Sequence, residues 1–229
     1  MRDLLQLNIG SFMEALSPQM ADRVRAEATI SKFSDGQIIQ SRGDTRAGLS
    51  IIKSGAGQMG VFGEDGTFVM MSVMGHGQTF GEVTLFTDIP RTQDFVAIGP
   101  TEIYQLSASR FRALCAQEPG LLETLLSITL ARSHFLLDVL DSLRRLGLRE
   151  RVAKTLYSMD LTAGLPGHVQ CRQSDLADMI GVSRVSLSKA LKDLSERGLI
   201  TLGYGSISFP DPDRFRRWVA RNCNVAIVS

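Results

Sequence analysis

A four-residue repeat of large apolar side chains marks the start of the hydrophobic pattern. Phe12, Leu16, Met20 and Val24 follow one another at this spacing. Residues four apart lie on the same face of an α-helix, so we expect one helix to lead into the region that follows.

Between residues 30 and 106 the pattern changes to short β-prone stretches, among them 37–40, 49–52 and 68–73. The sequence Glu64-Asp65-Gly66 predicts a hairpin turn, because Asp-Gly suits a turn that needs positive φ. Many short strands separated by turns are typical of a β-barrel or jelly roll, which we expect here. The glycines that we expect to separate the strands are Gly36, Gly43, Gly55, Gly57, Gly63, Gly66, Gly75 and Gly77.

A long helix is predicted from Pro119, since proline suits the first turn of a helix and the next proline is Pro166. Its apolar positions alternate between spacings of three and four, which is the seam of a coiled coil. Such a helix is about 40 Å long, more than one small barrel can cover, which favours pairing with a second copy. The alternative is a helix packed on its own barrel. The predicted seam is Leu122, Leu125, Thr129, Arg132, Leu136, Val139, Leu143 and Leu146.

Residues 173–191 have the pattern of two short helices joined by a tight turn. Ala177 stands where two helices would approach closely, and Gly181 stands at the turn, where positive φ favours glycine. Ser183 can cap the second helix through its hydroxyl. We interpret the stretch as a helix-turn-helix rather than an ordinary helical hairpin. The side chains expected to form its small core are Leu176, Ile180, Val182, Leu187 and Ala190.

The segment that follows predicts a winged version of this motif. Two β-prone stretches, 198–202 and 206–209, flank Gly203-Tyr204-Gly205 and predict a short hairpin. A last helix is expected from Asp211-Pro212-Asp213, carrying Phe215 and Trp218.

The second helix of the motif carries the side chains expected to meet DNA. Its outward positions after the cap are Arg184, Val185, Ser188 and Lys189. Arg184 can donate two hydrogen bonds to guanine O6 and N7, and Lys189 can reach the same atoms. Val185 can contact only an apolar group such as a thymine methyl. The residues expected at phosphates, which fix register, are Ser183, Ser186 and Lys192, with Gln173 as a further contact.

Composition and charge agree with this division of the chain. Lys and Arg number 25 against 24 Asp and Glu, but residues 148–229 hold 12 basic against 8 acidic residues and residues 1–147 hold 13 against 16. A basic C-terminal part favours a polyanionic partner. Three scattered cysteines, no secretory signal and no long apolar run predict a soluble cytoplasmic protein with no disulfide scaffold and no membrane contact.

A β-barrel, a long helix and a winged helix-turn-helix together resemble the bacterial Crp/Fnr family of transcription regulators. The resemblance implies an α+β fold with three parts: a cyclic-nucleotide-binding-like sensor domain at 1–118, a dimerisation helix and hinge at 119–147, and a DNA-binding domain at 148–229. It also implies a homodimer through residues 119–146, a palindromic operator in double-stranded DNA, and contact with RNA polymerase. Activation and repression are equally compatible with it.

The most specific match within the barrel covers residues 77–92, here called the cassette. Its sequence is similar to the phosphate-binding cassette of cyclic-nucleotide-binding domains. The resemblance places Glu82 at the ribose 2′-hydroxyl and Arg91 at the cyclic phosphate of cyclic AMP or cyclic GMP. Gly81 would leave its backbone amide open to the phosphate, and Thr92 could donate to it.

The sequence also departs from the family pattern. Gln93 and Asp94 follow where small residues are usual, and Leu136 and Leu137 stand where the cyclic-AMP receptor contacts adenine. Glu82 and Arg91 could therefore be a retained internal salt bridge in a degenerate pocket with no nucleotide effector. Val185 replaces a glutamate common in the family's recognition helix, so the operator need not match the well-known consensus sites.

Other chemistries are weaker interpretations. Iron–sulfur members of the family use N-terminal cysteines, and the first cysteine here is Cys115. Haem would need an axial ligand such as His76 or His134. A cupin-like metalloenzyme would need clustered ligands, whereas the three histidines are scattered, with the third at His168. We expect no enzymatic activity, and we expect a small effector in the barrel to act on the recognition helices through the hinge around Gly147.

Overall fold

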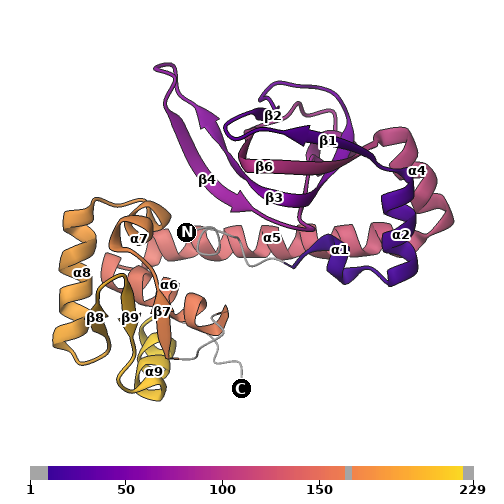
Figure 1. Ribbon diagram of the computed structural model, residues 1–229. Helices are drawn as coiled ribbons and strands as arrows, with labels where there is room; N and C mark the ends of the chain where they lie inside the picture. The colour runs from indigo at the N-terminus through magenta and orange to yellow at the C-terminus, as the bar shows by residue number, and fades with distance from the viewer. Residues whose placement is uncertain (1–9, 163–166, 224–229) are drawn as a thin grey trace. The chain divides into compact units, whose positions relative to one another are not determined.

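The structure is a computed structural model that describes residues 10–162 and 167–223. The chain forms two compact units, made of the described residues of Leu4–Ser133 and of His134–Ser229. The boundary falls within helix α5 (Pro119–Arg145), which belongs to both. Each unit is described by itself below, and the three-part division 1–118, 119–147 and 148–229 stays a prediction. The mixture of helices with two sheets confirms the α+β class (Figure 1).

The N-terminal lead-in is two helices instead of the single helix that the apolar repeat predicts. Helix α1 covers Phe12–Ala15 and helix α2 covers Pro18–Glu27. The break has a local cause, because Ser17 caps α2 by accepting from the Met20 amide and Pro18 occupies its first turn. The apolar repeat still packs inward, with Phe12 and Val24 fully buried.

Six strands form one antiparallel sheet in the N-terminal unit. The order is β1-β6-β3-β4, with β2 paired to β6 and β5 paired to β3. The described strands are jelly-roll-like and do not close into a barrel, which corrects the barrel alternative. Their bounds are β1 Thr29–Phe33, β2 Ile38–Gln40, β3 Gly48–Phe62, β4 Phe68–Met74, β5 Thr79–Phe80 and β6 Asp94–Ser107.

Strand β3 is one long strand where the glycine pattern predicts several short ones. Gly55 has φ of +81° and lies where the β3–β6 register shifts, so it makes a bulge within the strand. Gly57 is also inside the strand, and it must be glycine because a Cβ there would come 2.3 Å from the Phe95 ring. The hairpin prediction is confirmed: Phe62 pairs with Phe68, and Gly66 in the turn has φ of +77°.

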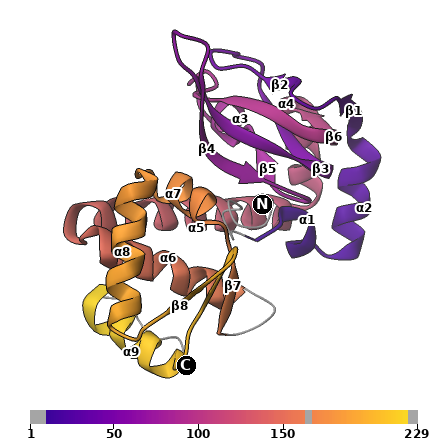
Figure 2. The ribbon, with the colours of Figure 1, turned by 60° about the vertical axis from the view of Figure 1, so that its left-hand side comes forward.

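Helices cover one end of the sheet. Helix α3 (Glu82–Phe86) follows β5, and helix α4 (Ala108–Gln117) precedes α5. Helices α2 and α4 are in contact and lie side by side in Figure 1, and Figure 2 shows α2 at the edge of the unit near β1. The core between them includes Phe12, Phe111, Leu121 and Leu125. The first half of α5 is therefore packed on its own unit.

That packing corrects part of the predicted coiled-coil seam. Leu125 is only 2% exposed within the core, and Arg132 donates to groups of the N-terminal unit. The alternative of a helix packed on its own barrel is thus right for these two positions. Large apolar side chains elsewhere on α5 are exposed: Leu122, Leu126, Leu130, Phe135, Leu136, Leu137, Val139, Leu140 and Leu143.

The C-terminal unit has the predicted winged helix-turn-helix. The second sheet has the order β7-β9-β8, in which β7 is a strand that the sequence did not predict. Leu176 and Leu187 are fully buried, as expected for the core of the motif, and Phe209 stacks on Phe215 of the last helix. The elements are α6 Leu148–Thr162, β7 His168–Gln170, α7 Gln173–Ile180, α8 Arg184–Glu196, β8 Thr201–Gly203, β9 Ser206–Ser208 and α9 Pro212–Cys223.

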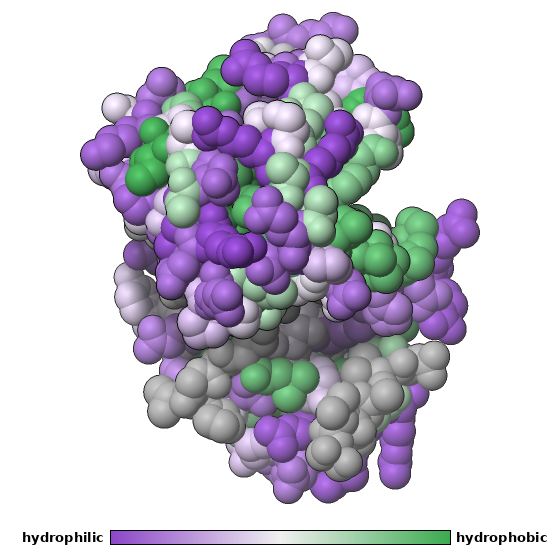
Figure 3. All heavy atoms as spheres, turned by 90° about the vertical axis from the view of Figure 1, so that its right-hand side faces the viewer, coloured by the Kyte–Doolittle hydropathy of each residue, from purple (hydrophilic) through white to green (hydrophobic). Residues whose placement is uncertain are grey.

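The surface mixes apolar and hydrophilic side chains. Figure 3 shows apolar residues in patches among hydrophilic ones on the face drawn there. Among the described helices, none combines the length and the hydropathy that crossing a membrane would require.

Candidate functional site

Glu82 opens helix α3 at a position fixed by the backbone before it. Gly81 has φ of +102°, a left-handed conformation that favours glycine, and it turns the chain from β5 into α3. The Glu82 carboxylate accepts from Arg132 Nη1 at 3.0 Å, and the same Nη1 donates to the Thr79 carbonyl at 2.9 Å. Both side chains are mostly buried. The cassette is therefore tied to helix α5 by a charged hydrogen bond.

Arg91 is buried close to Gly81 with its hydrogen bonds only partly satisfied. Its Nη2 donates to the carbonyls of Arg46 and Gly48 at 3.0 and 3.2 Å. Its Nε and Nη1 are buried without an acceptor in the described structure. A Cβ on Gly81 would come 2.2 Å from Nη1 and 2.6 Å from the Gly48 carbonyl oxygen, and this rigid backbone contact, with the positive φ, requires glycine there. Burial lowers the pKa of Arg91, and the charges of Asp44 and Glu82 offset only part of this lowering.

Burying a charged guanidinium whose two donor atoms have no acceptor costs free energy. An anion with several acceptor oxygens, such as a phosphate, is the partner that satisfies it. Because Nε and Nη1 are shielded from solvent, an anion reaches them only after Arg91 or the backbone at Gly81 moves. The residues present thus fit a phosphate-bearing ligand, and its binding would require the cassette to change shape.

The internal salt bridge between Glu82 and Arg91 is not formed. Glu82 pairs with Arg132, and Arg91 donates to backbone carbonyls. The prediction of a retained Glu82–Arg91 ion pair is therefore wrong, for the physical reason that a third residue, on α5, takes the carboxylate. The sequence contained a weak signal for this, since Arg132 is a charged residue in an otherwise mostly apolar seam.

The two residues at 93 and 94 form hydrogen bonds with neighbouring segments and not with the Arg91 guanidinium. The Asp94 carboxylate accepts from the Arg42 amide at 2.8 Å and from the Phe62 amide at 3.3 Å. Gln93 donates to the sulfur of Met71 at 3.4 Å. The Thr92 side chain is exposed. Gln93 and Asp94, where the sequence departs from the family pattern, thus hold neighbouring segments together, and neither forms a hydrogen bond or ion pair with Arg91 in the described structure.

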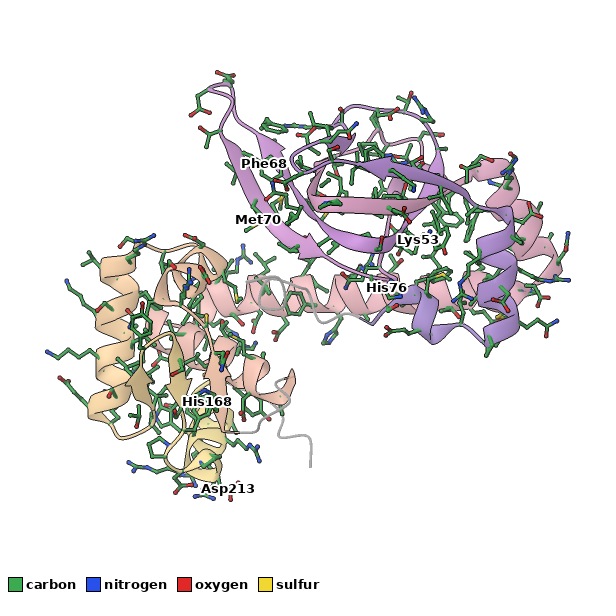
Figure 4. All side chains as sticks on the ribbon, viewed as in Figure 1. Lys53, Phe68, Met70, His76, His168 and Asp213 are labelled. Atoms are coloured by element: carbon green, nitrogen blue, oxygen red, sulfur yellow. The ribbon has the colours of Figure 1, made fainter. Side chains whose placement is uncertain are left out.

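Two of the three histidines have structural partners, and the third, His134, is exposed. His76 Nδ1 lies 2.8 Å from the Lys53 carbonyl in the N-terminal unit, as the labels in Figure 4 allow the reader to follow. His168 Nδ1 lies 3.3 Å from Ser208 Oγ in the C-terminal unit. No cluster of three potential metal ligands occurs among the residues that the structure describes.

The turn of the helix-turn-helix has the geometry that its sequence predicts. Gly181 ends α7 with φ of +72°, and Ser183 caps α8 by accepting from the Ser186 amide at 3.2 Å. Leu187, Leu191 and Leu194 hold the inner face of α8 in the core. The opposite face of α8 is therefore exposed, and the Ser183 cap fixes where the helix begins.

The predicted DNA contacts lie on that outward face of α8 or at its edge, except Gln173, which begins α7. Arg184, Ser188 and Lys189 are exposed, and Val185 is 67% exposed. An apolar side chain this exposed in the middle of a polar face suits a contact with an apolar base edge. The candidates for phosphate contacts are also accessible: Ser183, Gln173 and Lys192 are exposed, while Ser186 is half-buried beside the cap.

Sequence reasoning missed a polar contact that links α5 to the helix-turn-helix unit. Lys154 of α6 donates to Asp138 Oδ1 at 2.7 Å and to Ser142 Oγ at 2.8 Å, both on α5. The Lys154 side chain is largely buried. The contact holds α6, and with it α7 and α8, against the last turns of α5, within one compact unit.

Two family models match the sequence. The cyclic nucleotide-binding domain matches residues 30–118, and the Crp-like helix-turn-helix domain matches residues 150–218. The first match contains the whole cassette and the second contains both helices of the motif.

Curated relatives and solved structures agree with these matches. A CRP-like cAMP-activated global transcriptional regulator of Mycobacterium tuberculosis is 28% identical over 191 residues, covering 81% of this chain and 85% of that protein. The cyclic AMP receptor protein of Thermus thermophilus is 28% identical over 192 residues, covering 84% and 88%. The crystal structure of the Thermus thermophilus catabolite activator protein aligns with a TM-score of 0.53 and 26% identity over 93% of this chain and 99% of that chain. A CooA variant of Carboxydothermus hydrogenoformans shares the fold with a TM-score of 0.75 and 16% identity, covering 94% and 99%.

Proposed function

The chain belongs to the Crp/Fnr family of DNA-binding transcription regulators, and we propose that a cyclic nucleotide bound at the cassette controls its affinity for a palindromic DNA site. It is a regulator rather than an enzyme, because both matched domains and the named relatives are of that kind. A DNA partner makes the cytoplasm its expected location.

The observation that supports this effector most strongly is the state of Arg91. Its buried Nε and Nη1 have no acceptor, and the oxygens of a cyclic phosphate supply acceptors of the right charge. Glu82, already held by Arg132, is the carboxylate available to a ribose hydroxyl. An effector that competes with Thr79 or Glu82 for Arg132 would transmit its binding directly to α5.

The burial of the Arg91 guanidinium can give the effector different affinities for two states of the protein, which allosteric control requires. A ligand shifts an equilibrium only by its differential affinity for two states. In the described state Arg91 Nη1 is packed against Gly81. A second state, in which Nε and Nη1 face the ligand, would bind phosphate far better, so the ligand favours that state.

The homodimer is proposed to form through α5. Leu122, Leu126, Leu130, Leu137 and Leu140 are all at least 43% exposed and follow one another at spacings of three, four and seven along the helix. Covering such a row stabilises a dimer by removing apolar area from water. A second copy of α5 offers the same row and satisfies the symmetry of a palindromic operator.

Base recognition is proposed to come from Arg184, Val185, Ser188 and Lys189 of each subunit. The two α8 helices of a dimer would enter successive major grooves, about 34 Å apart. The serines, Lys192 and Gln173 would fix the register on phosphates.

Selection of DNA sites from a random pool, with and without cyclic AMP or cyclic GMP, tests both parts of this proposal. We expect a palindrome to be enriched and its affinity to rise with one of the nucleotides. Calorimetry should then show nucleotide binding that Arg91→Gln removes and that Arg25→Gln, a substitution at an exposed arginine on α2, leaves unchanged.

Two results would contradict the parts separately. Enrichment of a palindrome without any heat from either nucleotide would leave a DNA-binding regulator whose cassette has no nucleotide effector. Failure to enrich any site in any condition would overturn the proposed DNA recognition.

A further inference from the structure

The basic residues of the C-terminal unit are concentrated away from the recognition helix. Helix α8 carries three basic residues against two acidic ones, whereas the shorter α9 carries four arginines against one aspartate. The excess of basic over acidic residues in 148–229 favours a polyanionic partner but does not say which helix meets it. Most of the surplus is in fact on α9, a helix to which the proposed function gives no role.

The arginines of α9 divide into two that have partners and two that do not. Arg216 pairs with Asp160 and Asp213, and Arg214 donates to the Arg197 carbonyl at 3.0 Å. Arg217 and Arg221, four residues apart on the exposed side, form no hydrogen bond or ion pair with any residue of 10–162 or 167–223.

The inner face of α9 explains why these two arginines point outward. Phe215, Val219 and Cys223 are spaced by four and are buried. Residues two positions after each of the first two, Arg217 and Arg221, therefore fall on the opposite side of the helix. Figure 4 shows nitrogen-tipped side chains projecting around α9, where Asp213 is labelled. Two neighbouring guanidinium groups held on one helix face attract an extended anion.

Helix α9 is fixed beside the end of the recognition helix. Arg197, whose carbonyl accepts from Arg214, is the C-cap of α8. Arg149 of α6 donates to Asp193 of α8 at 2.9 Å and lies over the Trp218 ring of α9, 5.9 Å from its centroid. These contacts connect α8 and α9 within one unit, so the two helices move together when α8 docks on DNA.

We propose that Arg217 and Arg221 bind phosphates of the DNA duplex outside the segment whose bases α8 contacts. The inference rests on the DNA binding of the proposed function and adds a second contact to it. The base contacts come from the first turns of α8, and α9 lies beside its last turn, about 20 Å farther along a helix of thirteen residues. Arginine forks match phosphate oxygens, and such contacts add affinity without sequence preference.

Binding of the full-length protein to two duplexes tests the proposal. One duplex ends at the edges of the selected palindrome, and the other extends it by about one helical turn, roughly ten base pairs, on each side. The variant Arg217→Gln/Arg221→Gln is compared with Arg25→Gln/Lys32→Gln, which removes the same charge from exposed positions of the N-terminal unit. Affinity is measured by fluorescence anisotropy over a range of KCl concentrations.

For the wild type we expect tighter binding and a steeper salt dependence on the extended duplex. Each phosphate contact contributes about 0.9 to the slope of log K against log salt. A dimer has four of these arginines, so the slope of the α9 variant should be smaller by about four. Its affinity for the extended duplex should fall by more than about tenfold. It should match the wild type on the short duplex, in base preference and in thermal unfolding. The control variant should keep the wild-type slope on both duplexes.

A charge-preserving variant tests the role of charge independently. Arg217→Lys/Arg221→Lys should recover most of the slope, since lysine also neutralises a phosphate. An unchanged slope in the glutamine variant would overturn the proposal and direct the search to an acidic protein partner. An equal loss on both duplexes would overturn the placement outside the palindrome. If the wild type binds both duplexes no more tightly than duplexes of unrelated sequence, the proposed function itself fails. That result differs from either of the two above.

Discussion

Glu82 of the cassette accepts a hydrogen bond from Arg132 of α5 at 3.0 Å, while Arg91 remains buried without a carboxylate partner. Glu82 and Arg91 thus have separate partners, although their sequence pattern is also compatible with one internal ion pair. Arg132 joins the cassette to the long helix, and Arg91 keeps donors available for an anion. A ligand that changes the Glu82–Arg132 contact therefore acts on α5 directly.

Double-mutant cycles should assign the ion pair. Because Glu82 and Arg132 are both mostly buried and directly bonded, their coupling in the free energy of unfolding should be about 1–3 kcal/mol. The coupling between Glu82 and Arg91 should be smaller, as the two are not hydrogen-bonded. Urea unfolding of the single and double alanine variants provides the measurement. A larger coupling for Glu82 with Arg91 would contradict the described geometry.

Arg184→Ala should change which base is preferred rather than only weakening binding. Loss of a bidentate contact costs about 1–3 kcal/mol and relaxes selectivity at one position of each half-site. Lys192→Gln, at an exposed residue on the same helix, should lower affinity evenly for all sequences. A panel of duplexes with single-base changes distinguishes the two effects. An unaltered preference profile in Arg184→Ala would remove this residue from base recognition.

Lys154→Met should destabilise the C-terminal unit. It removes two hydrogen bonds from a largely buried ammonium group and leaves Asp138 without its partner, at an expected cost of about 1–3 kcal/mol. Lys192→Met is the matched control, since its lysine is 76% exposed and 3.7 Å from Glu196, a geometry that contributes less than about 1 kcal/mol. Equal effects of the two substitutions on urea unfolding would show that the Lys154 contact does not hold α6 to α5.

The elements that could be predicted from sequence are those with local signals at their ends. Ser183 and Gly181 mark the start of α8 and the end of α7 by capping and by positive φ, and α7 ends and α8 begins where these residues predict. The break between α1 and α2 had a signal of the same kind, Ser17 followed by Pro18. There the regular apolar spacing alone predicts one helix, and that prediction is wrong.

Features that depend on distant partners could not be predicted in this way. Gly55 and Gly57 resemble turn residues in sequence, but the approach of Phe95 and a bulge against β6 place them inside β3. Arg132 and Leu125 fit a coiled-coil seam and equally fit the surface of their own sheet, because both partners require the same helical period. Only the tertiary packing distinguishes these alternatives. Likewise, the sequence indicates Glu82 and Arg91 as site residues, but it does not indicate that Arg132 binds the Glu82 carboxylate.

Two buried thiols should make the protein less stable at alkaline pH. Burial, with a smaller contribution from Asp175, raises the pKa of Cys171 to about 11, and burial with Glu150 raises the pKa of Cys223 to about 11. The thiols of the unfolded chain ionise near pH 9. Below pH 9 both states keep the protons. Between pH 9 and 11 only the unfolded state releases them, so the free energy of unfolding falls by about 1.4 kcal/mol per pH unit for each thiol.

Comparison with Cys171→Ala/Cys223→Ala isolates this effect from other groups that titrate in the same range. The variant should be less stable than the wild type at pH 8, because the substitutions leave small cavities. Its further loss between pH 8 and pH 10 should be smaller than that of the wild type by about 3 kcal/mol, since two thiols each contribute about 1.4 kcal/mol at pH 10. Urea unfolding at the two pH values gives both differences. Equal losses in the two proteins would mean that the thiols ionise in the folded state as readily as in the unfolded chain, and that Cys171 and Cys223 are accessible to water.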